Sequence, residues 1–162
     1  MREILFRGKS IMRGDWVYGY LNQHRGNIRY DCDCEPIADG CYYINDWQAK
    51  IDNGMYGQDY KVDPDTVGQF TGLTDRNGTK IFEGDIVEYS HPYAGKSIHA
   101  VVQDGCRWNL SNFYASYFDC PGCAFSEGTE YMTVIGNIHD NPELLEVSKN
   151  DWCIHRRIHR NC

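Results

Sequence analysis

Apolar and polar residues alternate with a period of two in the regular segments of this chain, which is the pattern of β-strands with one buried face. In the segment "GDWVYGYL", Trp16, Tyr18 and Tyr20 point to one side, and Val17 and Leu21 point to the other. This alternation predicts a strand. Similar patterns predict further strands at residues 2–8, 67–70, 85–89 and 131–138.

The segment "HAVVQDGCRWNL", residues 99–110, has the pattern of a β-hairpin. Its Asp104-Gly105 pair suits a two-residue type I′ turn, which needs positive φ at both positions. Such a turn predicts three pairs across the hairpin: Gln103 with Cys106, Val101 with Trp108, and His99 with Leu110. These residues share one face, and we interpret it as the core face because Val101, Trp108 and Leu110 are apolar. His99 is then a structural histidine rather than a catalyst.

Other segments lack a regular pattern. Residues 22–60 are rich in Asp, Asn and Gly, so we expect loops and irregular strands there. Residues 111–128 are expected to form a long aromatic-rich loop. The Asp63-Pro64 pair indicates a turn, and residues 141–147 predict a short helix that begins with an Asn-Pro pair.

Taken together, these elements predict a mostly β fold with minor α. We expect an irregular β-rich region over residues 1–64 and a small barrel over residues 65–147 that ends in the short helix. A basic tail follows over residues 148–162. Short strands separated by turns favour the barrel, and the 12 Tyr and 4 Trp residues suit half-buried sheet faces.

The net charge of −7 is unevenly distributed, which bears on the partners to expect. Residues 1–80 carry 10 basic and 12 acidic side chains, and residues 81–147 carry 2 and 10. The tail carries 4 basic and 1 acidic side chain. A protein this acidic is a poor candidate for wrapping around a nucleic-acid backbone, because phosphate binding needs clustered Lys and Arg. No apolar run is long enough to span a membrane and the first residues lack a signal-peptide pattern, so we expect a cytoplasmic protein.

The stretch "GLTDRNGTKIFEGDIVEY" gathers several acidic residues, and we first considered a calcium loop. An EF-hand that began at Asp75 would need Gly at its sixth position and Glu at its twelfth, but Gly78 falls fourth and Glu83 ninth. A turn explains the same residues in either of two ways. Asn77-Gly78 is a two-residue type I′ turn that pairs Asp75 with Lys80, or Asp75 starts a four-residue turn closed by Gly78.

The triplet Glu83-Gly84-Asp85 has two carboxylates that acid–base catalysis requires. However, no His, Lys or Ser lies close in sequence to act with them. We therefore interpret the triplet as a second turn, with Gly84 in a special backbone conformation, that leads into the next strand.

Cysteine pairs offer the main candidate metal site. Cys120-Pro-Gly-Cys123 resembles half of a zinc knuckle, and Cys32-Asp-Cys34 supplies a second pair. If the fold brings the loops together, these four thiols form a Cys₄ zinc site; otherwise they are unrelated loop thiols. We expect no cofactor, with zinc at these residues as the alternative. The tail residues Cys153, His155, His159 and Cys162 are a weaker candidate, because a frayed, weakly basic terminus explains them better.

Three sequence blocks resemble the hallmark blocks of the YopX-like phage protein family. They are "REILFRGKS" with "GDWVYGYL", then "TVGQFTGLTDRNGTKIFEGDIV", then "VIGNIHDNPELLE", and the match spans residues 2–146. The resemblance implies a small phage or prophage protein with an SH3-like barrel in its C-terminal part, and it implies no reaction. The positions that carry the motifs are Gly72, Asn77, Gly78, Gly84, Asp85, Gly136, Asn137 and Pro142.

No catalytic constellation is present in the sequence, so we expect a non-enzymatic accessory protein that binds a partner. A protein or a second copy is the expected partner, because an aromatic-rich loop carries Phe113, Tyr114, Tyr117, Phe118 and Phe125. The alternatives are a nucleic-acid-associated small barrel, or a mimic of nucleic acid built on the acidic residues 81–147. No membrane and no small-molecule substrate are expected.

Overall fold

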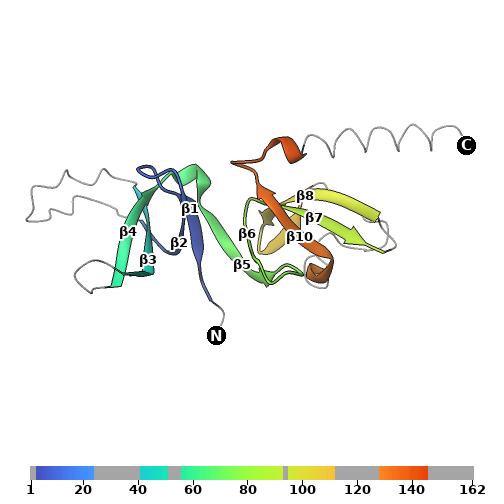
Figure 1. Ribbon diagram of the computed structural model, residues 1–162, viewed down its shortest axis with the longest axis horizontal. Helices are drawn as coiled ribbons and strands as arrows, with labels where there is room; N and C mark the ends of the chain where they lie inside the picture. The colour runs from blue at the N-terminus through green and yellow to red at the C-terminus, as the bar shows by residue number, and fades with distance from the viewer. Residues whose placement is uncertain (1–2, 24–40, 51–55, 93–94, 112–127, 146–162) are drawn as a thin grey trace, which may run out of the picture. The chain divides into compact units, whose positions relative to one another are not determined.

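The computed structural model describes residues 3–23, 41–50, 56–92, 95–111 and 128–145. The chain divides into two compact units, Met1–Phe70 and Thr71–Cys162. Nearly all regular structure in the described residues is β-strand, and every strand pairing given by register is antiparallel (Figure 1). The predicted mostly β fold is confirmed.

The first unit is an antiparallel sheet in the order β4-β3-β2-β1, with the start of β5 beside β1. Its strands are β1 (Phe6–Lys9), β2 (Trp16–Gln23), β3 (Tyr42–Lys50), β4 (Tyr56–Val62) and β5 (Gly68–Thr74). A 3-10 turn, η1 (Pro64–Thr66), joins β4 to β5 and is capped by the side chain of Asp63. This turn lies where the Asp63-Pro64 pair predicted one.

The first and last strands of this order, β4 and β1, come together where their C-terminal ends meet. Ser10, just after β1, forms a β-bridge with Val62, the last residue of β4. The amide of Ile11 donates to the Lys61 carbonyl at 3.0 Å, and the amide of Asp63 donates to the Lys9 carbonyl at 3.0 Å. The sheet therefore curls around its inner face, where the core consists of Val17, Ile44 and Val62 with Phe6, Leu21, Tyr42, Tyr60 and Val67.

Within residues 22–60, β3 and β4 pair as a hairpin whose register shifts between Asp46 and Lys50, which agrees with the irregular strands expected there. Residues 24–40 and 51–55 of this stretch lie outside the described residues. Some of its polar residues lie on the outer face of the hairpin. Asn45, for example, donates to Asp59 across the two strands at 3.0 Å. Polar residues are tolerated in a strand when that face meets solvent and the other face, here Ile44, is buried.

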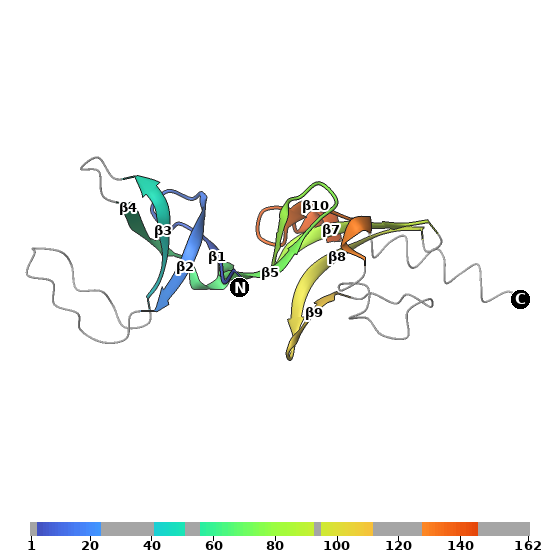
Figure 2. The same cartoon turned by 90° about the horizontal axis from the view of Figure 1, so that it is seen from below.

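The second unit contains a four-stranded antiparallel sheet in the order β10-β7-β8-β9, and β6 pairs with the end of β5. Its strands are β6 (Lys80–Phe82), β7 (Asp85–His91), β8 (Gly95–Asp104), β9 (Arg107–Leu110) and β10 (Met132–Asn137), with a 3-10 turn η2 (Thr129–Tyr131) before β10 (Figures 1 and 2). The core is formed by Ile81, Val87, Tyr89, Val101, Leu110 and Met132. A closed SH3-like barrel over residues 65–147 stays a prediction.

The β8–β9 hairpin forms, but with a different register from the one predicted. Val101 pairs with Leu110 and Asp104 with Arg107, so the two-residue loop is Gly105-Cys106. The predicted pairs were wrong by two residues. A shift of two leaves every side chain on its predicted face, and Val101 and Leu110 are indeed buried.

The C-terminal segment behaves partly as predicted. Residues 143–145 are helical, and the amides of Leu144 and Leu145 donate to the carbonyls of Asn141 and Pro142. Residues 141 and 142 of the predicted helix precede the helical turn, and residues 146 and 147 and the tail lie outside the described residues. No helix among the described residues has the length and apolarity to cross a membrane.

Candidate functional site

Asp75 lies at the end of β5 and organises the turn that follows. Its Oδ1 accepts hydrogen bonds from the amides of Asn77 (2.8 Å) and Thr79 (2.9 Å). Its Oδ2 accepts from the amide of Val134 in β10 at 3.0 Å. The amide of Gly78 donates to the Asp75 carbonyl at 3.0 Å, and the Asp75 amide to the Thr79 carbonyl. The four-residue turn is thus confirmed, and the pairing of Asp75 with Lys80 is wrong.

The environment of the Asp75 carboxylate makes it a structural anion. The residue is 5% exposed, and burial by itself raises its pKa. The three backbone N–H groups together outweigh that effect, so the pKa lies below the usual 3.8. A carboxylate that stays ionised and accepts hydrogen bonds from the backbone does not act as a general acid or base near neutral pH.

The Glu83-Gly84-Asp85 triplet also forms a turn, as predicted. Gly84 has a φ of +77°, which favours glycine. Its amide donates to the Val101 carbonyl and its carbonyl accepts from the Ile138 amide, both at 2.9 Å. The buried Asp85 carboxylate accepts from the Phe82 amide at 2.7 Å. These contacts link β6, β7, β8 and the end of β10, so the triplet is explained by the fold.

His99 is a buried histidine in the second unit. Its Nδ1 lies 2.8 Å from the Ser111 carbonyl oxygen, which is an acceptor, so Nδ1 carries the proton in this contact. Burial lowers the pKa of His99 below 6.5, against the opposing effect of the Ser111 contact. The predicted structural role of this residue agrees with its burial and its backbone partner.

The candidate zinc ligands Cys32, Cys34, Cys120 and Cys123 lie outside the described residues, so the zinc site stays a prediction. The same holds for the tail residues Cys153, His155, His159 and Cys162 and for the aromatic residues of the 111–128 loop. Within the described residues, no group of three or more His, Cys, Asp or Glu side chains is placed to hold a metal ion. Cys41 and Cys106 are free thiols.

A row of aromatic side chains lies on the outer face of the first sheet. The sequence pattern predicted that these residues share a face of β2. Trp16, Tyr18 and Tyr20 extend from alternate positions of β2, away from the buried Val17. Tyr18 is 47% exposed and Tyr20 is 51% exposed. The guanidinium of Arg7, from β1, lies 4.8 Å from the centroid of the Trp16 ring, within cation–π range.

A second exposed feature is the turn between β1 and β2. Ile11 is 57% exposed and Met12 is 90% exposed. Ser10 closes the turn, because its amide donates to the Asp15 carbonyl at 2.9 Å and its carbonyl accepts from the Gly14 amide at 2.8 Å. The turn therefore presents two apolar side chains to solvent on a hydrogen-bonded backbone.

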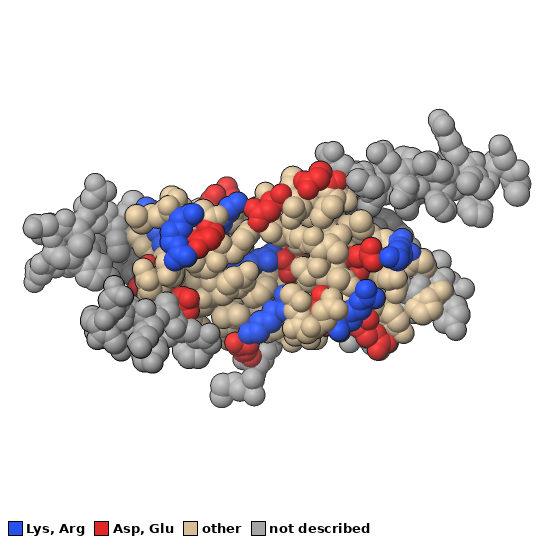
Figure 3. Space-filling model, viewed as in Figure 1, with Lys and Arg blue, Asp and Glu red and all other residues tan. Residues whose placement is uncertain are grey.

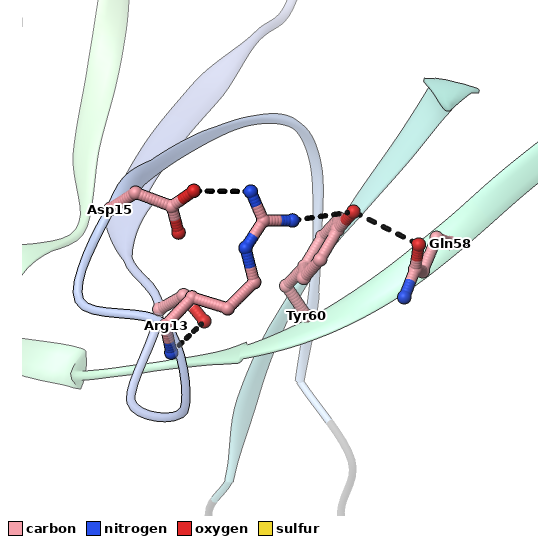
Figure 4. A network of polar contacts seen from close by, with 5 residues as sticks. Arg13, Asp15, Gln58 and Tyr60 are labelled. Carbon is pink, nitrogen blue, oxygen red and sulfur yellow. Dashed lines mark hydrogen bonds and ion pairs between the residues drawn. The ribbon is translucent and has the colours of Figure 1, made fainter. Parts of the chain in front are cut away.

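Arg13 connects this turn to β4 (Figure 4). Its guanidinium forms an ion pair with Asp15 and donates to the Tyr60 hydroxyl at 3.2 Å. The Tyr60 hydroxyl in turn donates to Gln58 Oε1 at 2.9 Å, and the Arg13 amide donates to Ser10 Oγ at 3.3 Å. The contacts are exposed, so each one contributes little to stability; together they restrict the orientation of the turn.

Charge does not single out one region of the described surface in the view of Figure 3. Lys and Arg side chains are interspersed there with Asp and Glu side chains. A broad single-sign field of the kind that steers charged macromolecules is not visible on this face. Any charge preference of this face must therefore come from a local arrangement of a few residues.

Comparison with known proteins places the chain in a family. A search of curated proteins gives no match. Among solved structures, the chain is similar to protein EF1440 from Enterococcus faecalis, with 23% identity over 90% of this chain and 99% of that chain and a TM-score of 0.47. The family model described as YopX protein matches residues 5–146. The chain therefore belongs to the YopX family.

Proposed function

We propose that this protein is a non-catalytic binding or assembly module of a phage or prophage. It acts in the cytoplasm of the bacterial host and holds a protein partner, which includes a second copy of itself. The observation that carries this proposal is the pair Ile11 and Met12, exposed on the turn between β1 and β2. The carboxylates that drew attention in the sequence, Asp75 and Asp85, are engaged by backbone amides instead of facing a substrate.

The physical argument is one of pre-organisation. Large apolar side chains gain free energy when a partner removes them from water, roughly 25 cal/mol for each Å² buried. Binding by a mobile loop loses part of that gain to the ordering of the backbone. Here the backbone of the turn is already held by Ser10, and the Arg13 side chain ties it to Tyr60. An exposed methionine on such a turn suits an apolar pocket of a partner.

The test places a photo-crosslinking amino acid at position 12 in the chain expressed in its bacterial host. The control places it at Val102, which is 37% exposed and lies in the second unit. We expect one crosslinked protein species at position 12 and none at position 102. Light scattering at increasing concentration then shows whether that species is a second copy. A monomer at all concentrations, with no crosslink at position 12, overturns the proposal.

A nucleic-acid-associated module is the second candidate function. It is favoured by the row of aromatic rings on β2 with Arg7 beside it, since stacking on aromatic side chains is a common way to hold unpaired bases. Opposed to it is the net charge of −7. Binding of a labelled single strand at low salt, where phosphate contacts are strongest, separates the two functions.

A further inference from the structure

We propose that the outer face of the first sheet binds single-stranded nucleic acid. This inference rests on the second candidate function named above and deepens it, because it assigns the residues of the surface and the class of nucleic acid. The surface, called the stacking face below, consists of Arg7, Lys9, Trp16, Tyr18, Tyr20, Tyr43 and Lys61. These residues come from the four strands β1, β2, β3 and β4.

The strand register places these side chains on one side of the sheet. Residues directly opposite each other in an antiparallel pair point to the same face. Arg7 is opposite Tyr18 and Lys9 is opposite Trp16. Further along the sheet, Tyr43 is opposite Lys61. On β2, residues two apart share a face, so Trp16, Tyr18 and Tyr20 form one row, and the core residue Val17 faces the other way.

The row continues from β2 onto β3. Tyr20 is opposite Asn45 and Asn22 is opposite Tyr43. Tyr43 is therefore the diagonal neighbour of Tyr20, within reach of a long aromatic side chain. Four rings thus follow one another across the face. Consecutive rings of β2 are about 6.8 Å apart, twice the rise of one strand residue.

This spacing suits an unstacked single strand. Neighbouring bases in a stacked strand are about 3.4 Å apart, so rings twice as far apart match bases that have separated from each other. Splayed bases of this kind are the ones that proteins bind by stacking on aromatic side chains. The half-exposed rings of Tyr18 and Tyr20 are held on one paired strand, with Tyr18 opposite β1 and Tyr20 opposite β3. Few degrees of freedom are then lost when a base stacks on them.

The charges on this face complement a phosphate backbone locally. Lys9 lies beside Trp16 at one end of the row, and Lys61 lies beside Tyr43 at the other end. Arg7 is only 6% exposed, so the basic groups open to a phosphate are Lys9 and Lys61, against one acidic group, Asp59, which lies opposite Asn45. The local sum is +1 in a chain whose net charge is −7.

A duplex fits this surface less well than a single strand. Specific duplex binders neutralise roughly 6–10 phosphates with Lys and Arg, whereas only Lys9 and Lys61 stand at the ends of this row. A duplex also hides the faces of its bases, which are the groups that the aromatic rings recognise. The stacking face therefore favours single strands with little dependence on base sequence.

The experiment measures fluorescence anisotropy of a labelled oligothymidylate of about a dozen nucleotides, close to the site size of other single-strand binders. Titrations are done at about 50 mM and about 200 mM salt, with a duplex of the same length as comparison. The protein is the full chain. We expect binding of the single strand at low salt, weaker binding of the duplex, and a salt slope of about −1 to −2 from two lysine contacts.

The main variant is Tyr20→Leu, which keeps an apolar side chain suited to a strand but removes the aromatic face. We expect it to weaken binding by about 5- to 100-fold, the effect of removing one stacked base. Tyr20→Phe keeps the ring and should restore binding. Ile4→Ser is the matched control, since Ile4 is 59% exposed in the same unit but lies outside the stacking face. Circular dichroism of each variant confirms that it is folded.

Several outcomes would overturn the proposal. They are the absence of binding at low salt, equal affinity of Tyr20→Leu and the unmodified chain, or equal affinity for the duplex. A photo-crosslinker at position 20 adds a direct reading. If it captures a protein and no nucleic acid, the stacking face is a protein contact. In that case this inference fails, and the protein-binding function at Met12 is judged separately by its own crosslink.

Discussion

Replacing the buried Asp75 should destabilise the second unit more than replacing an exposed turn carboxylate. Its carboxylate accepts three backbone hydrogen bonds, at 2.8, 2.9 and 3.0 Å. Hydrogen bonds to a charged group contribute about 1.5–3 kcal/mol each, and their sum is less than additive. The amides of Asn77 and Thr79 lie in the turn itself, where water can replace part of the loss. The amide of Val134 lies in β10 and has no such substitute near the turn.

From these contacts we expect Asp75→Ala to lower the free energy of unfolding by about 3–5 kcal/mol. Asp75→Asn should lower the free energy of unfolding by about 1–3 kcal/mol. Its side-chain oxygen still accepts hydrogen bonds from two amides, while its NH₂ group faces the amide of Val134 and cannot accept. Urea unfolding followed by circular dichroism measures both changes in unfolding free energy. The slope of that free energy against urea concentration should stay unchanged. The control Asp104→Asn, at an exposed hairpin end, should stay within about 0.5 kcal/mol.

The same contacts predict a dependence on pH. The pKa of Asp75 in the folded chain lies below the usual 3.8, so the unfolded chain binds more protons between the two values. The stabilisation is therefore present above about pH 3.8 and is lost as the pH falls towards the folded pKa. The reasoning is refuted if Asp75→Ala matches the Asp104 control, or if its unfolding free energy keeps the full acid dependence of the unmodified chain.

Three further predictions rest on other parts of the structure. Gly19→Ala should destabilise the first unit strongly, because the added Cβ would lie 1.9 Å from the Asn45 carbonyl oxygen; a midpoint of urea unfolding equal to that of the unmodified chain would contradict this. Burial lowers the pKa of His99, so stability should decrease as the pH falls below about 6.5, and His99→Gln should remove that part of a pH series of unfolding midpoints. Elemental analysis should find no stoichiometric metal; one zinc per chain, lost when Cys120 and Cys123 are replaced by Ser, would establish the zinc site instead.

Local features of the sequence were sufficient for most strands and turns. The alternation around Trp16, Tyr18 and Tyr20 predicted the face that each residue of β2 presents. Turn chemistry explained Asp75 and Gly84 without any reaction, because Asx side chains and positive-φ glycines act within a few residues. The sequence blocks also indicated the family, and the family model confirms it over residues 5–146.

Expectations failed or stayed incomplete where distant contacts decide the structure. Residues 22–60 were expected to form loops and irregular strands, and the pairing of β3 with β4 supplies hydrogen bonds that no local pattern reports. The hairpin register was wrong by two residues because such a shift leaves both faces unchanged. The preference for the observed register comes from Leu110, which is buried opposite Val101 in the core of the second unit.

The sequence by itself determined most of the strands and turns and the family, because these depend on residues that are close along the chain. Only the tertiary structure decided which surfaces the protein offers to a partner. Arg7, Trp16, Tyr43 and Lys61 are far apart in sequence, and the register of four paired strands places them on one face. The third acceptor contact of Asp75, to Val134, likewise exists only because β10 returns beside the turn. Alternation gives each side chain a face, but the pairing of strands decides its neighbours.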